Sequence, residues 1–204
     1  MTATAAPGVA LPIVLLPVGV DDDALDACLG ALDAGTPAGT RVWLADDARA
    51  GPRAHAIVER WLARTQMQAH YTRRQRMVGD VAHLDEALNA CGDADVVVLA
   101  PDARPAPGWL VQLTACLARD PAIGTATPWS NAGEAASWPR IGEIDAIPDD
   151  LDLPHVHLAR YFDAADLARA ARYERVVRWE WLVSQLVLLA VRRLRDHVVD
   201  HGAV

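Results

Sequence analysis

The chain has 204 residues, 52% of them hydrophobic, which argues for a globular protein with one sizeable core. Its net charge of −8 disfavours non-specific binding to nucleic acid. All 19 positive residues are arginine, a usage that we attribute to a GC-rich bacterial genome rather than to function.

Residues 1–10 are expected to form a flexible tail, and the regular elements begin after them. Continuous apolar runs predict strands buried on both faces, whereas apolar residues at helical spacing predict the helices between them. In chain order, the expected elements are a strand at 11–18, a helix after 21–23, a strand at 42–45, a helix from Pro52, a strand at 68–72, a helix from Asp80, a strand at 96–99, a helix at 109–119 and a strand at 123–127. This alternation predicts an α/β fold with a mostly parallel sheet and helices on both faces.

The last third of the chain has a different character. Residues 132–161 are rich in Pro, Gly and Asp and are expected to form an irregular connection, and residues 162–204 are expected to form a C-terminal helical segment. The apolar run at 181–191 is too short to span a bilayer. Packing against the sheet or a second protomer is one interpretation of this helix, and a position on the membrane surface is another.

Acidic residues follow two of the predicted strands. Asp46 and Asp47 come directly after the second strand, and Asp102 follows the strand at 96–99. Carboxylates just beyond the carboxyl ends of parallel strands lie where ligands bind, and they can accept hydrogen bonds from a nucleobase or a ribose, or hold a divalent cation. The alternatives are that Asp46 or Asp47 caps the next helix and that Asp102 belongs to an ordinary turn.

Two further groups of residues are candidates for a ligand site. Arg73, Arg74 and Arg76 follow the third strand and could pair with phosphate oxygens, although a solvated basic patch is the favoured interpretation of these residues taken alone. Trp129, Ser130 and Asn131 follow the last predicted strand and could contact a sugar, although tryptophan is also a common core residue.

In their order and spacing, these turns resemble the N-terminal, nucleotide-sugar-binding half of a family 2 glycosyltransferase, which has the GT-A (Rossmann-like) fold. The resemblance covers residues 11–131. The matching stretches are PIVLLPV at 12–18, VWLADD at 42–47, LDEALN at 84–89, ADVVVLAPD at 94–102, PGWL at 107–110 and DPAIGTATPWSN at 120–131.

The resemblance implies a role for each candidate residue. Asp46 and Asp47 would hold the base and ribose of a nucleotide-sugar donor, and Asp102 would take the last position of a D-x-D motif that coordinates Mg²⁺ or Mn²⁺. The other residues of the implied site are Pro17, Val18 and Arg76 for nucleotide binding, and Trp129, Ser130 and Asn131 for the acceptor or sugar region.

The chain also departs from the family pattern. Ala100 replaces the first acid of the D-x-D motif, and we identify no catalytic base, because Asp149 and Asp150 come too early in the chain. Two hypotheses therefore stand: a metal-assisted glycosyltransferase that transfers a sugar to an acceptor hydroxyl, or a catalytically inactive or truncated GT-A-like nucleotide-binding or scaffold module. A nucleotidyltransferase is disfavoured because the chain has no lysine for a phosphate loop.

The sequence also gives expectations about surroundings and partners. The three cysteines have no metal-ligand spacing and are expected to be buried thiols in a reducing compartment, and we find no signal peptide. We therefore expect a cytoplasmic protein, in one interpretation peripheral at the inner membrane or dimeric through its C-terminal helix. The acceptor, whether a saccharide, a lipid-linked sugar or a protein, is not defined by these residues.

Overall fold

The computed structural model describes residues 10–119, 123–128, 157–161 and 187–189. In this part of the chain, helices and strands alternate as far as β5. The elements are β1 (Ile13–Pro17), α1 (Asp22–Gly35), β2 (Arg41–Asp46), α2 (Pro52–Leu62), β3 (Gln68–Arg73), α3 (Asp80–Ala90), β4 (Val96–Val98), α4 (Trp109–Leu117), β5 (Ile123–Pro128), β6 (His157–Tyr161) and β7 (Val187–Leu189).

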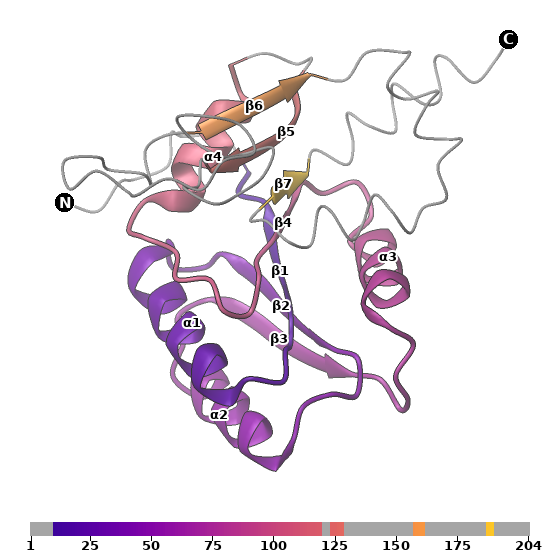
Figure 1. The fold of residues 1–204 in the computed structure, drawn as a ribbon. Coiled ribbons are helices and arrows are strands. Elements are labelled where there is room, and N and C mark those ends of the chain that lie inside the picture. The colour runs from indigo at the N-terminus through magenta and orange to yellow at the C-terminus, as the bar shows by residue number, and fades with distance from the viewer. Residues whose placement is uncertain (1–9, 120–122, 129–156, 162–186, 190–204) are drawn as a thin grey trace, which may run out of the picture.

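The described strands form one mixed sheet in the order β3-β2-β1-β4-β7-β5-β6 (Figure 1). Strands β3, β2, β1 and β4 are parallel, whereas β7 runs antiparallel to both β4 and β5, and β6 runs antiparallel to β5. A helix connects each parallel strand to the next parallel strand along the chain, as such crossovers require. The sheet therefore has a parallel half and an antiparallel half.

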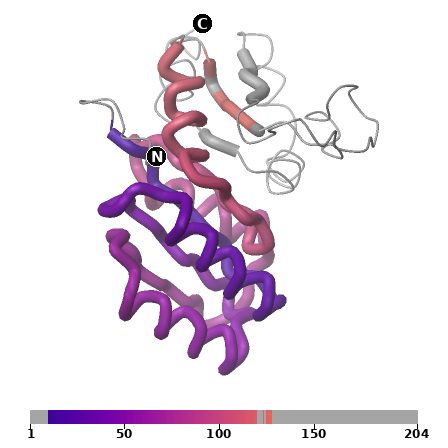
Figure 2. Tube along the Cα trace, turned by 90° about the vertical axis from the view of Figure 1, so that its left-hand side faces the viewer, coloured from indigo at the N-terminus to yellow at the C-terminus, as the bar shows by residue number. Residues whose placement is uncertain are grey.

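Helices cover both faces of the parallel half, as Figure 1 shows with the sheet seen from its edge. Alternate strand residues such as Val14, Leu16 and Leu44 pack with α1, α2 and α4, while Leu15 and Val98 pack on the other face with α3. Figure 2 shows α1 and α2 lying next to one another across the first face. Because successive strand residues point to opposite faces, the continuous apolar runs of β1 and β4 satisfy both layers.

Local sequence explains where the first two helices begin. Asp21 caps α1, since its Oδ1 accepts hydrogen bonds from the backbone N–H groups of Asp23 and Ala24, both at 3.0 Å. Pro52 occupies the start of α2 after Gly51, where the missing proline N–H costs no helical bond. The expected strands and helices between residues 11 and 128 are thus confirmed, with ends that differ by a few residues.

Two segments near the carboxyl end differ from expectation. Val187–Leu189 form strand β7 rather than part of a helix, and His157–Tyr161, placed in an irregular connection, form strand β6. An apolar run as short as that around residue 188 fits a buried strand as well as a helix, and pairing with β4 and β5 decides in favour of the strand. Most of the predicted C-terminal helical segment, including any dimer or membrane contact through it, lies outside the described residues.

Within the described ranges, none of the helices is both long enough and apolar enough to cross a bilayer.

Candidate functional site

The carboxyl ends of the parallel strands bring most of the candidate residues to one edge of the sheet. Pro17 at the end of β1 pairs in register with Ala45 of β2, and Asp46 pairs with Arg73 at the end of β3. The register of β1 and β4 is set by Leu15 opposite Val98. In open parallel sheets this edge is where ligands bind.

Asp46 and Asp47 lie on opposite sides of the sheet edge. Asp46 has the same parity along β2 as Leu44 and therefore turns toward the face covered by α2, whereas Asp47 turns toward the face covered by α3. Both side chains are nearly inaccessible, with exposed fractions of 0% and 3%. Two adjacent buried carboxylates require donors close by, because an unpaired buried charge is costly.

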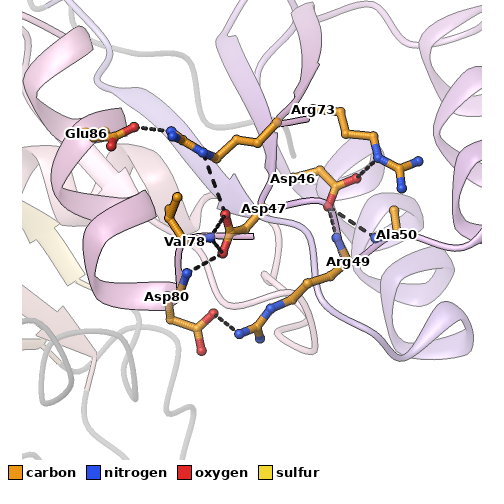
Figure 3. Close-up of polar contacts among 10 residues, drawn as sticks. Asp46, Asp47, Arg49, Ala50, Arg73, Val78, Asp80 and Glu86 are labelled. Atoms are coloured by element: carbon orange, nitrogen blue, oxygen red, sulfur yellow. Dashed lines mark hydrogen bonds and ion pairs between the residues drawn. The ribbon is translucent and has the colours of Figure 1, made fainter. Parts of the chain in front are cut away.

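The carboxylate of Asp46 receives three hydrogen bonds. Its Oδ1 accepts from the backbone N–H groups of Arg49 at 2.7 Å and Ala50 at 3.1 Å (Figure 3), and its Oδ2 accepts from the Tyr71 hydroxyl at 2.6 Å. The guanidinium Nε of Arg73 lies 3.6 Å from the same Oδ2. Asp46 thus fixes the loop between β2 and α2 to strand β3.

The loop that Asp46 holds contains a strained backbone position. Ala48 has a φ of 60°, and among the described residues it is the one non-glycine residue with a positive φ. A side chain in this left-handed region costs free energy, and such strain persists only where surrounding interactions over-determine it. The two backbone hydrogen bonds to Asp46 lie directly after Ala48 and supply that restraint.

Asp47 joins the same loop to the start of α3. Its carboxylate accepts hydrogen bonds from the backbone N–H groups of Val78 at 2.9 Å and Gly79 at 2.7 Å. Arg74 approaches Asp47 with its Nε at 3.8 Å and pairs with Glu86 of α3 through Nη1. A second link between the loops is the ion pair of Arg49 with Asp80, at 2.9 Å.

Helix capping, the alternative considered for the acidic pair, is not what the structure shows at α2. The N-cap residue of α2 is Gly51, without a side-chain cap hydrogen bond. Asp47 instead serves the residues that begin α3, where the N-cap residue Gly79 has a φ of 96° and no capping side chain of its own. The two acids therefore hold loops rather than the helix that follows them.

Tyr71 and His55 belong to the site although the sequence did not single them out. The Nε2 atom of His55, on α2, lies 2.7 Å from the Tyr71 hydroxyl, and the two rings meet edge to face. Burial, followed by the hydrogen bond to Asp46, raises the pKa of Tyr71 above its ordinary value. The signal available in the sequence was the period of two along β3, which puts Tyr71 on the same face as Arg73.

The remaining predicted nucleotide residues line the same edge. Pro17 is half-buried and Val18 is buried in the core, with its backbone N–H bonded to the Ala45 carbonyl at 2.8 Å. Arg76 is exposed and, with Arg74 and Gln75, lines an open hollow beyond β3. Among these, Arg76 offers an accessible cationic group.

Asp102 occupies the turn that follows β4. Its side chain is exposed, and the turn is closed by a hydrogen bond from Ala103 N–H to the Ala100 carbonyl at 3.0 Å. The neighbouring Pro101 packs so tightly on the loop after β1 that a Cβ added to Gly19 would lie 2.9 Å from its Cγ. The two loops are therefore in direct contact.

Burial, followed by the negative charge of Asp102, raises the pKa of the Cys28 thiol to about 12. This second cause is an electrostatic interaction of Asp102 with a thiol on α1. In the described residues, no group of three or more His, Cys, Asp or Glu side chains is arranged to hold a metal ion. Asp102 alone still fits Mg²⁺ or Mn²⁺ chemistry, since such ions are commonly bound by one or two carboxylates with phosphates and water.

The predicted sugar or acceptor residues Trp129, Ser130 and Asn131 lie outside the described residues, as do Asp149 and Asp150.

Comparison with known proteins bears on the fold. No protein-family model matches the sequence, and no curated protein matches it. Among solved structures, the chain is similar to the mannosyltransferase PcManGT from Pyrobaculum calidifontis, in complex with GDP-Man and Mn²⁺. The TM-score is 0.55 and the identity 15%, with 100% of this chain and 78% of that one covered.

Two other solved structures are less similar. TarS 1–349 from S. aureus matches with a TM-score of 0.45 and 13% identity, over 58% of this chain and 41% of that one. The CMP:2-keto-3-deoxy-manno-octonic acid synthetase complexed with CTP matches with a TM-score of 0.40 and 19% identity, over 62% of this chain and 56% of that one. The likeness to the mannosyltransferase confirms the GT-A type of α/β fold that the sequence resemblance predicted.

Proposed function

We propose that this protein is a glycosyltransferase related to family 2, which binds a nucleotide-diphosphate sugar at the carboxyl edge of its sheet and transfers the sugar to an acceptor hydroxyl. The observation that carries the proposal is the buried pair Asp46 and Asp47, which organises the loops after β2 and β3 at the edge where GT-A folds and other open sheets receive ligands. The solved mannosyltransferase with the same fold holds GDP-Man, which supports a donor of this class.

Each residue of the proposed donor site has a separate task. Pro17 and Val18 form the wall at the end of β1, and Asp46 receives a donor group of the base. Asp47 keeps the loop before α3 in place beside the ribose, and the exposed Arg76 pairs with phosphate oxygens. These assignments keep both carboxylates in their observed hydrogen bonds and use the groups that remain available.

A divalent cation would be held on the diphosphate by Asp102, with the other ligands supplied by phosphate oxygens and water. Such an ion neutralises negative charge that develops on the departing nucleoside diphosphate. The residues present supply a partial motif, because Ala100 stands where a second carboxylate would be. The solved mannosyltransferase contains Mn²⁺, which supports testing this ion first.

A second candidate function is a GT-A-like module that binds a nucleotide without catalysis. Ala100 and the missing base motif favour it. The two candidates share the donor site and differ in turnover. Release of free sugar or a glycosylated product from radiolabelled donor, across a panel of hydroxyl acceptors, supports the enzyme, and saturable binding without any turnover supports the module.

Calorimetric titration with UDP, GDP, CDP and ADP, each with and without Mn²⁺, tests the donor site. We expect one or more nucleotides to bind, and Mn²⁺ to tighten that binding at least tenfold. Asp102→Asn should remove the Mn²⁺ effect, while Asp26→Asn, an equal charge change at an exposed ion pair on α1, should preserve it. Absence of binding by all four nucleotides rejects the proposal, and an unchanged Mn²⁺ effect in Asp102→Asn rejects the role of that residue.

A further inference from the structure

Tyr71 links His55 of α2 to Asp46 through its hydroxyl group. The hydroxyl oxygen lies 2.6 Å from Oδ2 of Asp46 and 2.7 Å from Nε2 of His55. An ionised carboxylate only accepts hydrogen bonds, so the single phenolic proton is donated to Asp46. The phenolic oxygen also lies within hydrogen-bonding distance of Nε2 of His55, and the same Nε2 lies 3.2 Å from Nη1 of Arg73.

The hydrogen bonds leave one acceptor position on Asp46. A carboxylate has about four lone-pair sites, and three are used by the backbone of Arg49 and Ala50 and by the Tyr71 hydroxyl. The fourth, on Oδ2, faces Arg73 Nε at 3.6 Å, which is too long for a hydrogen bond. The side chain of Arg73 is 40% exposed and also contacts Nε2 of His55 through Nη1 at 3.2 Å. It is therefore the partner of Asp46 that a ligand can displace, at the cost of that contact.

We propose that Tyr71 is a positioning residue for donor recognition, which orients Oδ2 of Asp46 so that its fourth lone pair accepts an N–H of the nucleobase when Arg73 moves aside. The inference rests on the proposed function and adds a residue to its site. Uracil and guanine present a ring N–H to such an acceptor, whereas cytosine and adenine present only an exocyclic amino group. That amino group lies at a different place on the base edge, so a carboxylate held in one orientation for a ring N–H distinguishes the two groups of bases.

The geometry also indicates what the loss of the hydroxyl would do. In Tyr71→Phe, Oδ1 of Asp46 keeps its two backbone donors, so the loop stays attached to the carboxylate. Oδ2 loses the hydrogen bond from the Tyr71 hydroxyl that orients it. The nearby guanidinium of Arg73 can then move closer and donate a hydrogen bond to Oδ2. The acceptor position is then occupied by the protein itself.

Calorimetry of the full chain with UDP, GDP, CDP and ADP tests the proposal. For Tyr71→Phe we expect affinity for UDP or GDP, whichever the native protein binds, to fall about tenfold, the range of one hydrogen bond to a charged group. Any weaker binding of CDP and ADP should change less than twofold. The ratio of the affinity for UDP or GDP to the affinity for CDP and ADP should therefore fall. A general loss of structure would weaken all four nucleotides alike and leave this ratio unchanged.

Thr72→Val is the matched control. Thr72 follows Tyr71 on β3, and its Oγ1 accepts a hydrogen bond from Trp43 Nε1 at 2.7 Å on the other face of the sheet. This variant loses one hydrogen bond from the same strand, and we expect its nucleotide ratio to equal that of the native protein. An equal fall for all four nucleotides in Tyr71→Phe, or an unchanged ratio, overturns the proposal.

Arg73→Met keeps the inference testable if Tyr71→Phe does not fold. Because this variant removes the displaceable partner of Asp46, affinity for UDP or GDP should stay equal or rise, and a tenfold fall contradicts the proposed displacement. Binding of none of the nucleotides by the native protein would instead reject the proposed function itself, so the two failures are distinguishable.

Discussion

At the scale of single residues, Ala48 lies in a strained backbone conformation that the hydrogen bonds of Asp46 maintain. Its φ of 60° is unfavourable for a residue with a Cβ, and glycine would adopt the same conformation freely. We expect Ala48→Gly to raise the free energy of unfolding by about 1 kcal/mol, measured by urea denaturation.

Gly39→Ala is the reciprocal control for Ala48. Gly39 has a φ of 77° with no neighbouring atom within 4 Å of an added Cβ, so the substitution tests backbone strain without a clash. It should lower stability by about 1 kcal/mol. Shifts of the same sign in both variants would contradict the assignment of strain to the left-handed conformation.

The residue scale also shows the limit of reading the site from the sequence. The order of strands and turns predicted that Asp46, Asp47 and Asp102 lie at the carboxyl edge, because that follows from parallel topology alone. It did not predict that both paired acids are buried with donors from the chain. Tyr71 becomes a partner of Asp46 only when β3 pairs with β2, and His55 reaches Tyr71 only when α2 packs on β3. Local patterns do not encode these tertiary contacts.

At the scale of elements, the loop after β2 and the loop before α3 behave as one unit through Asp47. Replacing Asp47 by Ala leaves the backbone N–H groups of Val78 and Gly79 without their acceptor. We expect a loss of about 1–3 kcal/mol in the free energy of unfolding, and faster hydrogen exchange at those two amides.

Asp26→Ala provides the comparison for Asp47→Ala. It removes an exposed ion pair with Arg60 between α1 and α2, and such pairs contribute at most about 1 kcal/mol. Equal losses in the two variants, or unchanged exchange at Val78 and Gly79 in Asp47→Ala, would show that the two loops are not coupled through this carboxylate.

The sequence predicted well those elements whose apolar pattern fits either a strand or a helix but not both. The run at β1 is bounded by an acidic helix start and was correctly expected to be a buried strand. The run around Val187–Leu189 was expected to be helical, yet it forms β7 between β4 and β5. Its place in the sheet depends on strands far away in the chain, so periodicity within the run could not decide it.

At the scale of the whole molecule, the free energy of unfolding should fall at alkaline pH, because the buried thiol of Cys28 stays protonated in the folded protein. Burial, followed by the charge of Asp102, raises the pKa of Cys28 from 9.0 to about 12. Between these values the unfolded chain releases a proton that the folded protein retains. This contribution to stability is complete below pH 9 and is lost as the pH rises toward 12, by about 1.4 kcal/mol per pH unit.

Urea denaturation at several pH values between 8 and 11 measures this dependence in the native protein and in Cys28→Ala. The variant should be less stable at pH 8, because it loses packing in the core, but its stability should fall less steeply above pH 9. Cys91→Ala is the control, since Cys91 is only half-buried and Arg41 opposes the rise of its pKa, so the slope should change less. Parallel pH profiles for the native protein and Cys28→Ala would show that the thiol is not kept protonated by the fold. The expected difference would show that the fold keeps the Cys28 thiol neutral where it lies buried, 3.7 Å from the Ala100 carbonyl oxygen of the turn after β4.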